Sequence, residues 1–430
     1  MSAPARIAIT GTGAVCGAGL TIDAIWDRLR SGRPAMAPIT HWDATRWPVR
    51  VASEVLADSR TLVEDRKLHK IITRTDLFGL YAADMAVKQS GLLAHRGTLA
   101  AADATRFNDR SGIFAGSGGG AYGSNYDFFP LMTTAAGSLE TFGRELGSSV
   151  NPMWLLKHLP NNVLCHVGIR YGFKGTNACI TNQCVSGSLA VAEAAAAICA
   201  GEADRAIAVA HDAPIEPETV LRYHQVGLLD PEALRPFNQA RRGTVFGEGS
   251  GAVVLEDMTG AEARHAAVLG ELLGSGCTTE AIGLLDIRPD GDGVSRALEL
   301  ALRDAGLSPA EVGLVVAHGN GTRASDASEA VAIRRVFGSN PPPVTAFKWA
   351  WGHLIAASGL VDLVLALRAL QQQLVPGIAT LGTLDPELAP LPVTTATQKP
   401  RSDIAAVICR GFAGMNVVLV VRASPASSAR

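Results

Sequence analysis

The sequence is poor in net charge and in long uninterrupted apolar runs. It has 430 residues, of which 47% are hydrophobic, and a net charge of −2. A near-neutral chain lacks the basic domain expected of a general nucleic-acid-binding protein. The apolar run from Leu189 to Ala200 falls short of the roughly 20 residues needed to cross a bilayer. We therefore expect no nucleic-acid and no membrane binding, and the length allows two domain-sized halves.

Paired cysteines are also missing. None of the seven cysteines forms a CxxC pair, so the sequence predicts neither a metal site nor a disulfide framework. Scattered, reduced thiols are typical of a cytoplasmic protein, and Ile7 to Thr10 resembles a first core strand more than a signal peptide. The cysteines are Cys16, Cys165, Cys179, Cys184, Cys199, Cys277 and Cys409.

Short apolar strands alternate with helical patterns along the whole chain. Such alternation predicts an α/β fold whose sheets are covered on both faces. The segment 256–264 resembles a join, after which the pattern restarts, although no internal repeat is evident. We predict a first half over 1–257, a second half over 258–422, and a disordered tail over 423–430, which is small and polar.

The chain is organised around residues 177–204, which read as strand, sharp turn and alanine-rich helix ending at Gly201. Cys184 falls at the turn. A cysteine at a helix start lies on the positive end of the dipole, which favours the thiolate. Free backbone N–H groups there can also stabilise a tetrahedral oxyanion. A single buried cysteine is more often inert, so the assignment depends on the rest of the chain.

Four apolar strands end on reactive or glycine-rich sequence. These ends carry Cys184, His318, Lys348 with His353 close behind, and Phe412 in a Gly-Phe-Ala-Gly loop. Strand ends of such folds meet in a shared crevice. A cysteine with histidines elsewhere in the chain is the arrangement of a nucleophilic enzyme.

Segments carrying these residues resemble the elongating β-ketoacyl-acyl-carrier-protein synthases, in the same order and over nearly the whole chain. The resemblance implies a thiolase-like fold, with two similar α/β halves packed as five α-β-α-β-α layers, normally in a dimer. The matching segments are RIAITGTGAV, GIFAGSGGG, QCVSGSLAVAEA, RPFNQARRGTVFGEGSGAVVLED, VVAHGNGTRASDASEA, FKWAWGHLIAASG and CRGFAGMN.

The resemblance also implies a reaction and its residues. Cys184 takes an acyl group from a carrier protein, and the enolate made by decarboxylating malonyl carrier attacks it. His318 and His353 would bind the thioester oxygen and stabilise enolate charge. Lys348 would support the histidines, with Glu329 as its counter-charge, because a buried ammonium needs a partner.

Further residues receive roles by the same resemblance. Phe412 would be the gate, and its N–H would join that of the nucleophile in the oxyanion hole. Thr322 and Asn320 would bind pantetheine, although a threonine is usual at the second position. Gly119 and Gln183 would border the acyl pocket, where the glycine leaves room for a longer chain.

The expected partner is an acidic acyl carrier protein, whose phosphopantetheine carries the substrates, so no cofactor is predicted. Arg66, Lys67 and Lys70 form the densest basic cluster and are the predicted carrier contact. The second expected partner is another subunit, in a homodimer or in a heterodimer with a ketosynthase-like chain-length factor.

Departures from the usual family sequence favour specialised polyketide or polyene synthesis over fatty-acid synthesis. Trp349 and Trp351 flank the lysine where small residues are common, and either add aromatic surface to the acyl site or pack inside. Two other functions stay open. One is a non-catalytic partner subunit resembling a chain-length factor, and the other is a thiolase using Cys409 as a second cysteine.

Overall fold

The computed structural model describes residues 5–119 and 126–425, and in these residues ten strands form one continuous sheet. Their order is β10-β9-β11-β12-β8-β1-β7-β6-β4-β5, so each half of the chain supplies five neighbouring strands. The first half supplies β1 (Ile7–Cys16), β4 (Ser111–Ser117), β5 (Asn177–Ile180), β6 (Arg205–Asp212) and β7 (Gly249–Asp257). The second supplies β8 (Gly270–Thr279), β9 (Leu314–Val316), β10 (Val344–Thr345), β11 (Ile404–Gly411) and β12 (Met415–Ala423).

The two sets of strands repeat one pairing pattern. In the first half β1 and β6 are both antiparallel to β7, and β4 is parallel to β6 and β5. In the second half β8 and β11 are both antiparallel to β12, and β9 is parallel to β11 and β10. The halves join where Ile7–Ile9 of β1 pairs with Gly270–Leu272 of β8. The topology therefore shows the two similar halves that the family resemblance implied, although no internal repeat is evident in the sequence.

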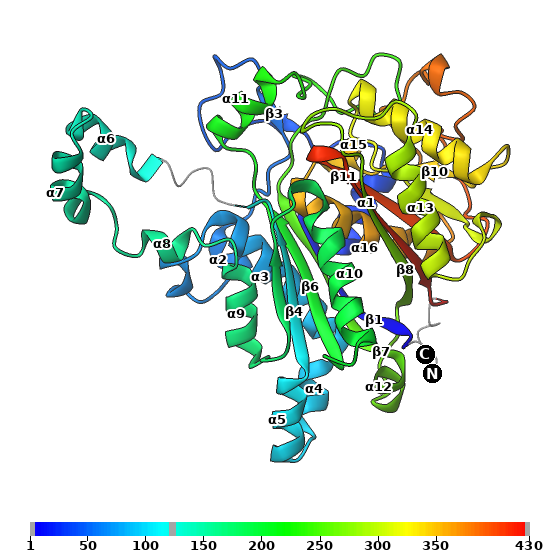
Figure 1. Cartoon of the computed structure of the whole chain (residues 1–430), viewed down its shortest axis with the longest axis horizontal. Coiled ribbons are helices and arrows are strands. Elements are labelled where there is room, and N and C mark those ends of the chain that lie inside the picture. The colour runs from blue at the N-terminus through cyan, green and yellow to red at the C-terminus, as the bar shows by residue number, and fades with distance from the viewer. Residues whose placement is uncertain (1–4, 120–125, 426–430) are drawn as a thin grey trace.

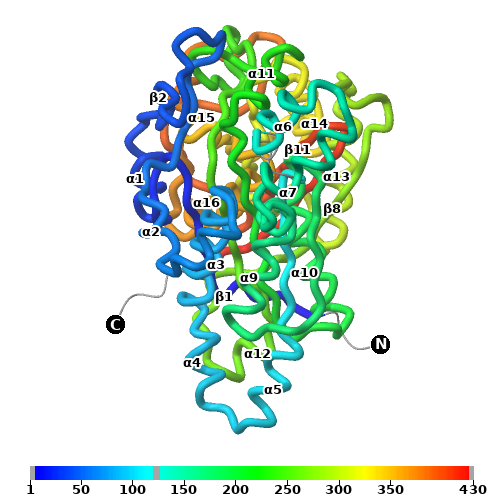
Figure 2. Tube along the Cα trace, turned by 90° about the vertical axis from the view of Figure 1, so that its left-hand side faces the viewer, coloured from blue at the N-terminus to red at the C-terminus, as the bar shows by residue number. Residues whose placement is uncertain are grey.

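Helices complete five layers, as the α-β-α-β-α expectation requires. α10 (Ser186–Cys199) and α16 (Ser358–Gln371) lie between the two sets of strands and contact each other (Figure 1). α3 (Arg74–Ser90) and α9 (Asn162–Tyr171) run side by side over the outer face of the first half (Figure 2). α13 (Asp292–Asp304) and α14 (Arg323–Phe337) cover the second half.

Shorter helices surround these layers. They are α1 (Ile22–Arg30), α2 (Ser59–Leu62), α4 (Leu92–Gly97), α5 (Ala101–Asp109), α11 (Pro217–Gln225), α12 (Met258–Ala263) and α15 (Lys348–Trp351). A small separate sheet pairs β2 (Ala37–Pro38) with β3 (Val51–Ala52). None of the helices in the described residues is both long and apolar enough to cross a membrane.

Small residues allow the central helices to approach the sheet closely. A Cβ added at Gly116 of β4 would lie 2.6 Å from the backbone carbon of Ser186, at the start of α10. A Cβ added at Gly187 would lie 2.6 Å from the carbonyl oxygen of Ala356, just before α16. Both distances are too short for a side chain, so glycine is required where the two central turns meet the sheet and each other.

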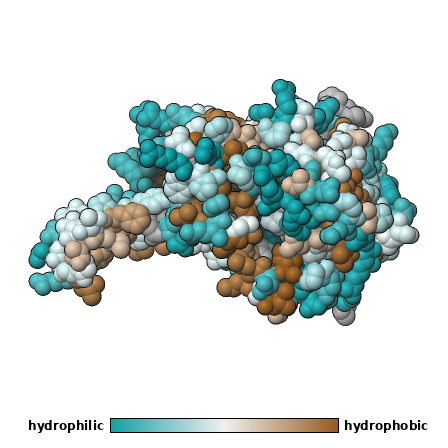
Figure 3. All heavy atoms as spheres, turned by 90° about the horizontal axis from the view of Figure 1, so that it is seen from above, coloured by the Kyte–Doolittle hydropathy of each residue, from teal (hydrophilic) through white to brown (hydrophobic). Residues whose placement is uncertain are grey.

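An arm of three helices projects from the first half. It comprises α6 (Phe129–Ala135), α7 (Leu139–Ser149) and α8 (Trp154–Lys157), and α6 and α7 lie well away from the sheet (Figure 1). Apolar atoms are visible along the arm in the space-filling view (Figure 3). Its exposed large apolar residues are Phe129, Met132, Leu139, Leu146, Met153, Leu155 and Leu156.

The chain ends differ in part from expectation. Ala423, the first residue of the predicted tail, belongs to β12, and residues 426–430 lie outside the described ranges. The predicted division after residue 257 falls between β7 and α12. α12 packs against β1 and β7, and the strands of the second half begin only at Gly270. The exact division of the halves stays a prediction.

Candidate active site

One cleft collects most of the residues that the strand ends predicted. It lies where the two halves meet, above the ends of β9 and β11 and the starts of α10 and α16. Its lining residues include the predicted Cys184, His318, Asn320, Thr322, His353 and Phe412, together with Tyr223, Leu228, Thr244, Leu284, Leu285, Asp286, Ile287, Ser325, Ile355, Arg410, Gly411 and Gly414.

Cys184 lies in a single 3-10 turn, Gln183–Val185, directly before α10. Its side chain is 5% exposed, and the buried thiol of Cys409 donates to its carbonyl oxygen at 3.1 Å. Burial raises the pKa of the Cys184 thiol well above its ordinary value, an effect that nearby Lys348 opposes. Burial therefore outweighs the effect of the helix start, which favours the thiolate, and the resting group is the thiol.

The glycine-rich loop approaches the nucleophile from the second half. A Cβ added at Gly411 would lie 3.6 Å from the Cβ of Cys184, so the chain entering Phe412 passes directly beside the thiol turn. The ring of Phe412 meets the ring of Tyr223 edge-on, with centroids 5.4 Å apart. The loop thus brings a backbone segment and an aromatic side chain to the nucleophile, as a gate and oxyanion hole would require.

Hydrogen bonds set the tautomer of His353. The Ile355 N–H donates to Nδ1 of His353 at 3.0 Å, and the Ser358 hydroxyl lies 2.9 Å from the same nitrogen. The Ser358 oxygen itself accepts the Leu354 N–H at 3.0 Å, so its own proton is free to point at the ring. With Nδ1 accepting, the neutral ring carries its proton on Nε2.

His318 is held in the same way from two sides. The Arg410 N–H lies 3.3 Å from Nδ1 of His318, which makes Nε2 the protonated nitrogen of the neutral ring. The buried carboxylate of Glu329 accepts the His318 N–H at 2.7 Å and the Gly319 N–H at 3.0 Å. Glu329 therefore anchors the backbone that carries the histidine.

Both histidines are neutral donors. Burial, followed by the charge of Lys348, holds the pKa of each ring well below its ordinary value of 6.5. The two rings are nearly perpendicular, at 77°, with centroids 5.2 Å apart. Two adjacent Nε2–H groups in a buried cleft can stabilise negative charge that develops on a single oxygen.

The direct ion-pair partner of Lys348 is Asp362, whereas the predicted Glu329 adds only a weaker effect on the pKa of Lys348. Nζ of Lys348 lies 2.6 Å from Oδ2 of Asp362, and both side chains are fully buried. Burial alone would lower the pKa of Lys348, but Asp362 raises it above its ordinary value, so the ammonium stays charged. Glu329 makes no direct pair with Lys348, because its oxygens accept the His318 and Gly319 backbone N–H groups.

Comparison with known proteins agrees with this geometry. A family model described as Beta-ketoacyl synthase, N-terminal domain, matches residues 5–261. A second, described as Beta-ketoacyl synthase, C-terminal domain, matches residues 269–381. The chain belongs to the β-ketoacyl synthase family. It is thus an acyltransferase of the condensing type, and the family expected from the sequence is confirmed.

Individual relatives cover the chain almost completely. It is 32% identical over 424 residues to nodulation protein E of Rhizobium sp. (strain N33), covering 97% of this chain and 99% of that protein. It is 31% identical over 425 residues to 3-oxoacyl-[acyl-carrier-protein] synthase 2 of Synechocystis sp., covering 97% and 98%. The solved ishigamide ketosynthase/chain length factor matches with a TM-score of 0.85 and 27% identity, over 98% and 100%. The thiolase-like fold is thereby confirmed.

The remaining residues that the resemblance to β-ketoacyl synthases predicted lie partly on the cleft wall and partly outside it. Asn320 and Thr322 lie on the cleft wall, where the Thr322 hydroxyl donates to Oδ1 of Asn320 at 2.9 Å. Gly119 is exposed and has a φ of +96°, and Gln183 donates to the Gly118 carbonyl at 2.9 Å. Neither Gly119 nor Gln183 is among the described residues that line the cleft, so their acyl-pocket roles stay predictions.

The tryptophans and the basic cluster lie elsewhere. Trp349 and Trp351 are fully buried in the core and do not belong to the described cleft lining, which favours internal packing over contact with an acyl chain. Arg66, Lys67 and Lys70 are exposed around a short 3-10 turn, so their charges can reach a partner. Cys409 is buried beneath the nucleophile, not in the cleft wall, which disfavours the thiolase alternative.

Sequence reasoning missed several residues of the site. One feature of the sequence pointed to Asp362 as a buried partner, since it is the only carboxylate in the apolar stretch 354–370. Ser358, which sets the His353 tautomer, had no such feature, because a serine at a helix start normally reads as a cap. No sequence pattern indicated the buried pair of Arg410 and Glu280, whose charged groups lie 2.7 Å apart. The wall formed by Leu284 and Leu285 lies in a segment without a recognisable pattern.

Proposed function

We propose that this chain catalyses the decarboxylative condensation of an acyl group on Cys184 with malonyl carrier protein. The observation that carries the proposal is the convergence of one buried thiol and two neutral Nε2–H donors on one cleft. We favour specialised polyketide or polyene synthesis over fatty-acid synthesis, because Asn320, Trp349 and Trp351 differ from the residues usual in the family.

In the first half-reaction the sulfur of Cys184 attacks the acyl thioester of the carrier. The new thioester forms on Cys184, and the thiol proton leaves with the pantetheine sulfur. Because burial raises the thiol pKa, attack and proton loss should be coupled, so no free thiolate accumulates. The backbone N–H groups of Cys184 and Phe412 would donate hydrogen bonds to the developing oxyanion.

In the second half-reaction malonyl carrier loses CO₂, and its carbonyl oxygen takes on enolate charge. His318 and His353 would each donate Nε2–H to this oxygen. The enolate carbon attacks the acyl carbonyl, the bond to Cys184 breaks, and the sulfur recovers a proton. The Lys348–Asp362 pair would keep both rings neutral and oriented, with the ammonium adding positive potential behind them.

The pantetheine arm would enter along Asn320 and Thr322, whose polar groups suit its amides, and Phe412 would close over the acyl group. Arg66, Lys67 and Lys70 would attract the acidic carrier. The chemistry requires no further cofactor, because the carrier delivers both substrates already activated as thioesters.

A second ketosynthase-like chain is the proposed partner of the arm, in a homodimer or with a chain-length factor. Exposed apolar side chains such as Leu139, 87% exposed, and Leu155, 61% exposed, are typical of a surface that a partner protein buries. The similarity to the ishigamide ketosynthase/chain length factor supports this type of partner. Light scattering of the purified chain distinguishes the two cases, since a homodimer forms without any added protein.

Intact-protein mass spectrometry tests the function. The chain is incubated with acyl carriers of different lengths and saturation, and with Cys184→Ala as the matched control. We expect one acyl adduct per chain, absent in the control, and formation of β-ketoacyl carrier after malonyl carrier is added. A chain that remains unmodified by every acyl carrier would instead support the non-catalytic partner subunit.

A further inference from the structure

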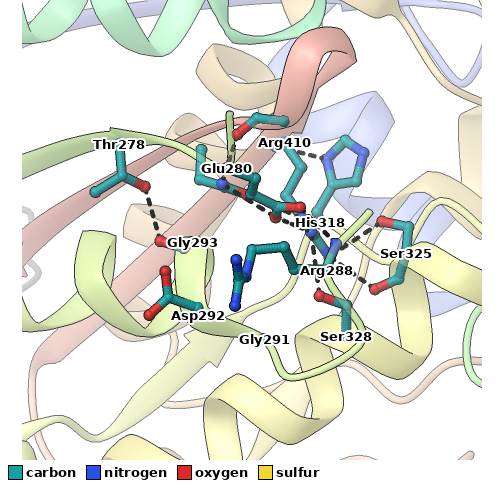
Figure 4. Close-up of polar contacts among 12 residues, drawn as sticks. Thr278, Glu280, Arg288, Gly291, Asp292, Gly293, His318, Ser325, Ser328 and Arg410 are labelled. Atoms are coloured by element: carbon teal, nitrogen blue, oxygen red, sulfur yellow. Dashed lines mark hydrogen bonds and ion pairs between the residues drawn. The ribbon is translucent and has the colours of Figure 1, made fainter. Parts of the chain in front are cut away.

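Arg410 places a full positive charge inside the cleft wall. It is the penultimate residue of β11, its side chain is 5% exposed, and it adjoins Gly411 and the Phe412 turn. The family resemblance gives it no role, and the reaction proposed above does not use its charge. Figure 4 shows Arg410 between His318 and Glu280.

The guanidinium contacts several separate elements. Nε donates to Oδ1 of Asn416 on β12 at 3.0 Å, and one terminal nitrogen donates to the Ser325 carbonyl on α14 at 2.8 Å. The other terminal nitrogen lies 2.7 Å from Glu280 and 3.3 Å from the Ser328 hydroxyl (Figure 4). These contacts occupy the whole donor fork, so the side chain is held in one orientation.

Glu280 extends the same network to the opposite wall of the cleft. Its second carboxylate oxygen accepts the Arg288 N–H at 2.7 Å, which closes the loop that carries Leu284 and Leu285. Its own N–H donates to the Gly414 carbonyl at 3.0 Å, and the Ala413 N–H donates to the Leu284 carbonyl at 2.8 Å. The Arg410–Glu280 pair thus connects the gate loop with the wall that faces it.

Stability alone does not account for such a pair. Two charges buried together lose their hydration, and apolar residues of similar volume are often no less stable. What the pair does provide is fixed geometry. The backbone N–H of Arg410 bonds Nδ1 of His318, while the next residue, Gly411, lies against Cys184.

We propose that Arg410 is a positioning residue of the condensing reaction. Paired with Glu280, it fixes the end of β11 so that His318 keeps its Nε2–H donor aimed into the cleft and the Phe412 turn stays beside Cys184. This inference rests on the proposed function, since it assigns Arg410 to the step in which His318 stabilises the enolate.

The test compares two double variants of the full-length chain. Arg410→Gln/Glu280→Gln removes both charges without leaving either one unpaired. Arg264→Gln/Glu256→Gln is the matched control, because that buried arginine–glutamate pair, 2.5 Å apart, joins β7 to the residue that follows α12, and neither residue lines the cleft. Malonyl carrier decarboxylation is measured as CO₂ release per folded chain, with the folded fraction of each variant taken from its circular dichroism spectrum and its elution in gel filtration.

We expect kcat to fall at least about tenfold in the Arg410/Glu280 variant, with KM nearly unchanged, because the loss concerns charge that develops only in the transition state. The control pair should keep both constants. The milder Glu280→Asp variant keeps both charges and should fold even where the double variant does not, and it should lose kcat by at least about threefold.

Smaller losses of kcat in these variants, or equal losses in the control pair, would show a merely structural role and overturn the inference. Absence of acyl loading and decarboxylation in the wild-type chain is a different result. It would refute the proposed function, and this inference with it.

Discussion

Two turns at the centre of the molecule have the same backbone and different chemistry. In the first half a 3-10 turn, Gln183–Val185, leads into the 14-residue helix α10. In the second half a 3-10 turn, Ile355–Ala357, leads into the 14-residue helix α16. The first residue of each turn has a positive φ, +49° at Gln183 and +45° at Ile355.

The side chains on these matched turns differ. The middle residue is Cys184 in the first half and Ala356 in the second. Four residues after the first serine of the helix, α10 has Ala190 and α16 has Asp362, the partner of Lys348. One duplicated scaffold thus provides the nucleophile from one half and the charge-stabilising residues from the other. The predictions below test that division, from the largest expected effect to the smallest.

Making the first turn resemble the second should have the largest effect. Cys184→Ala places in the first half the residue found at Ala356, and should abolish acyl loading and condensation completely. The fold should persist, since the volume lost is small. Mass spectrometry of the loaded enzyme and product analysis measure this. Condensation by Cys184→Ala would show that the first half does not provide the nucleophile.

Removing either histidine should affect one half-reaction much more than the other. His318→Ala or His353→Ala should slow malonyl decarboxylation by about 10²–10³, the usual effect of losing one oxyanion donor. Acyl transfer to Cys184 should change far less, because enolate charge develops only with malonyl carrier. Single-turnover assays of both steps decide it, and equal losses would contradict the division of labour between the halves.

Breaking the buried ion pair between Lys348 of α15 and Asp362 of α16 should lower the free energy of unfolding. Asp362→Asn leaves the Lys348 ammonium unpaired in the core, at a cost of about 3–5 kcal/mol. Lys348→Met/Asp362→Leu removes both charges and should recover most of the unfolding free energy, but not the decarboxylation rate. Denaturant unfolding and the CO₂ assay follow the two quantities. Full activity of the double variant would show that the pair is purely structural.

Acidification should reveal the depressed histidine pKa values. Protonation would add a hydrogen to Nδ1 of His318 and His353, opposite backbone N–H groups that already donate there. Because both pKa values lie well below 6.5, the rings remain neutral as the pH falls to about 6. The kcat for decarboxylation should therefore stay nearly constant between about pH 8 and 6. A loss of kcat centred near the ordinary histidine value would contradict this.

The smallest effect concerns the outer surface of the first half. Arg66→Glu together with Lys70→Glu should raise the apparent KM for acyl carrier a few-fold, and wild-type loading should slow with added salt. The kcat should not change, since these side chains are exposed and distant from the cleft lining. Arg106→Glu/Lys399→Glu, at two exposed side chains that do not line the cleft, is a control of equal charge change. Loading that is independent of salt would remove this carrier contact.

The sequence was sufficient for the family, the α/β class and the reactive residues. Cys184, His318, Lys348 and His353 stand at or just after strand ends, and a parallel strand end is readable from its apolar run and the glycines beside it. The two similar halves were expected only from the family resemblance and not from an internal repeat, because the halves share backbone pairings while their side chains have diverged. The correspondence between the two halves is evident only from the pairing of their strands.

Tertiary structure alone decided the protonation states and the partners. The helix dipole favours a thiolate at Cys184, but burial raises the pKa of this thiol and keeps it protonated. Lys348 could have paired with any carboxylate of the second half, and packing of α16 selected Asp362. The pKa of a buried group depends on every charge and dipole that packs around it. These groups come from distant segments of the chain, so no local sequence pattern predicts that pKa.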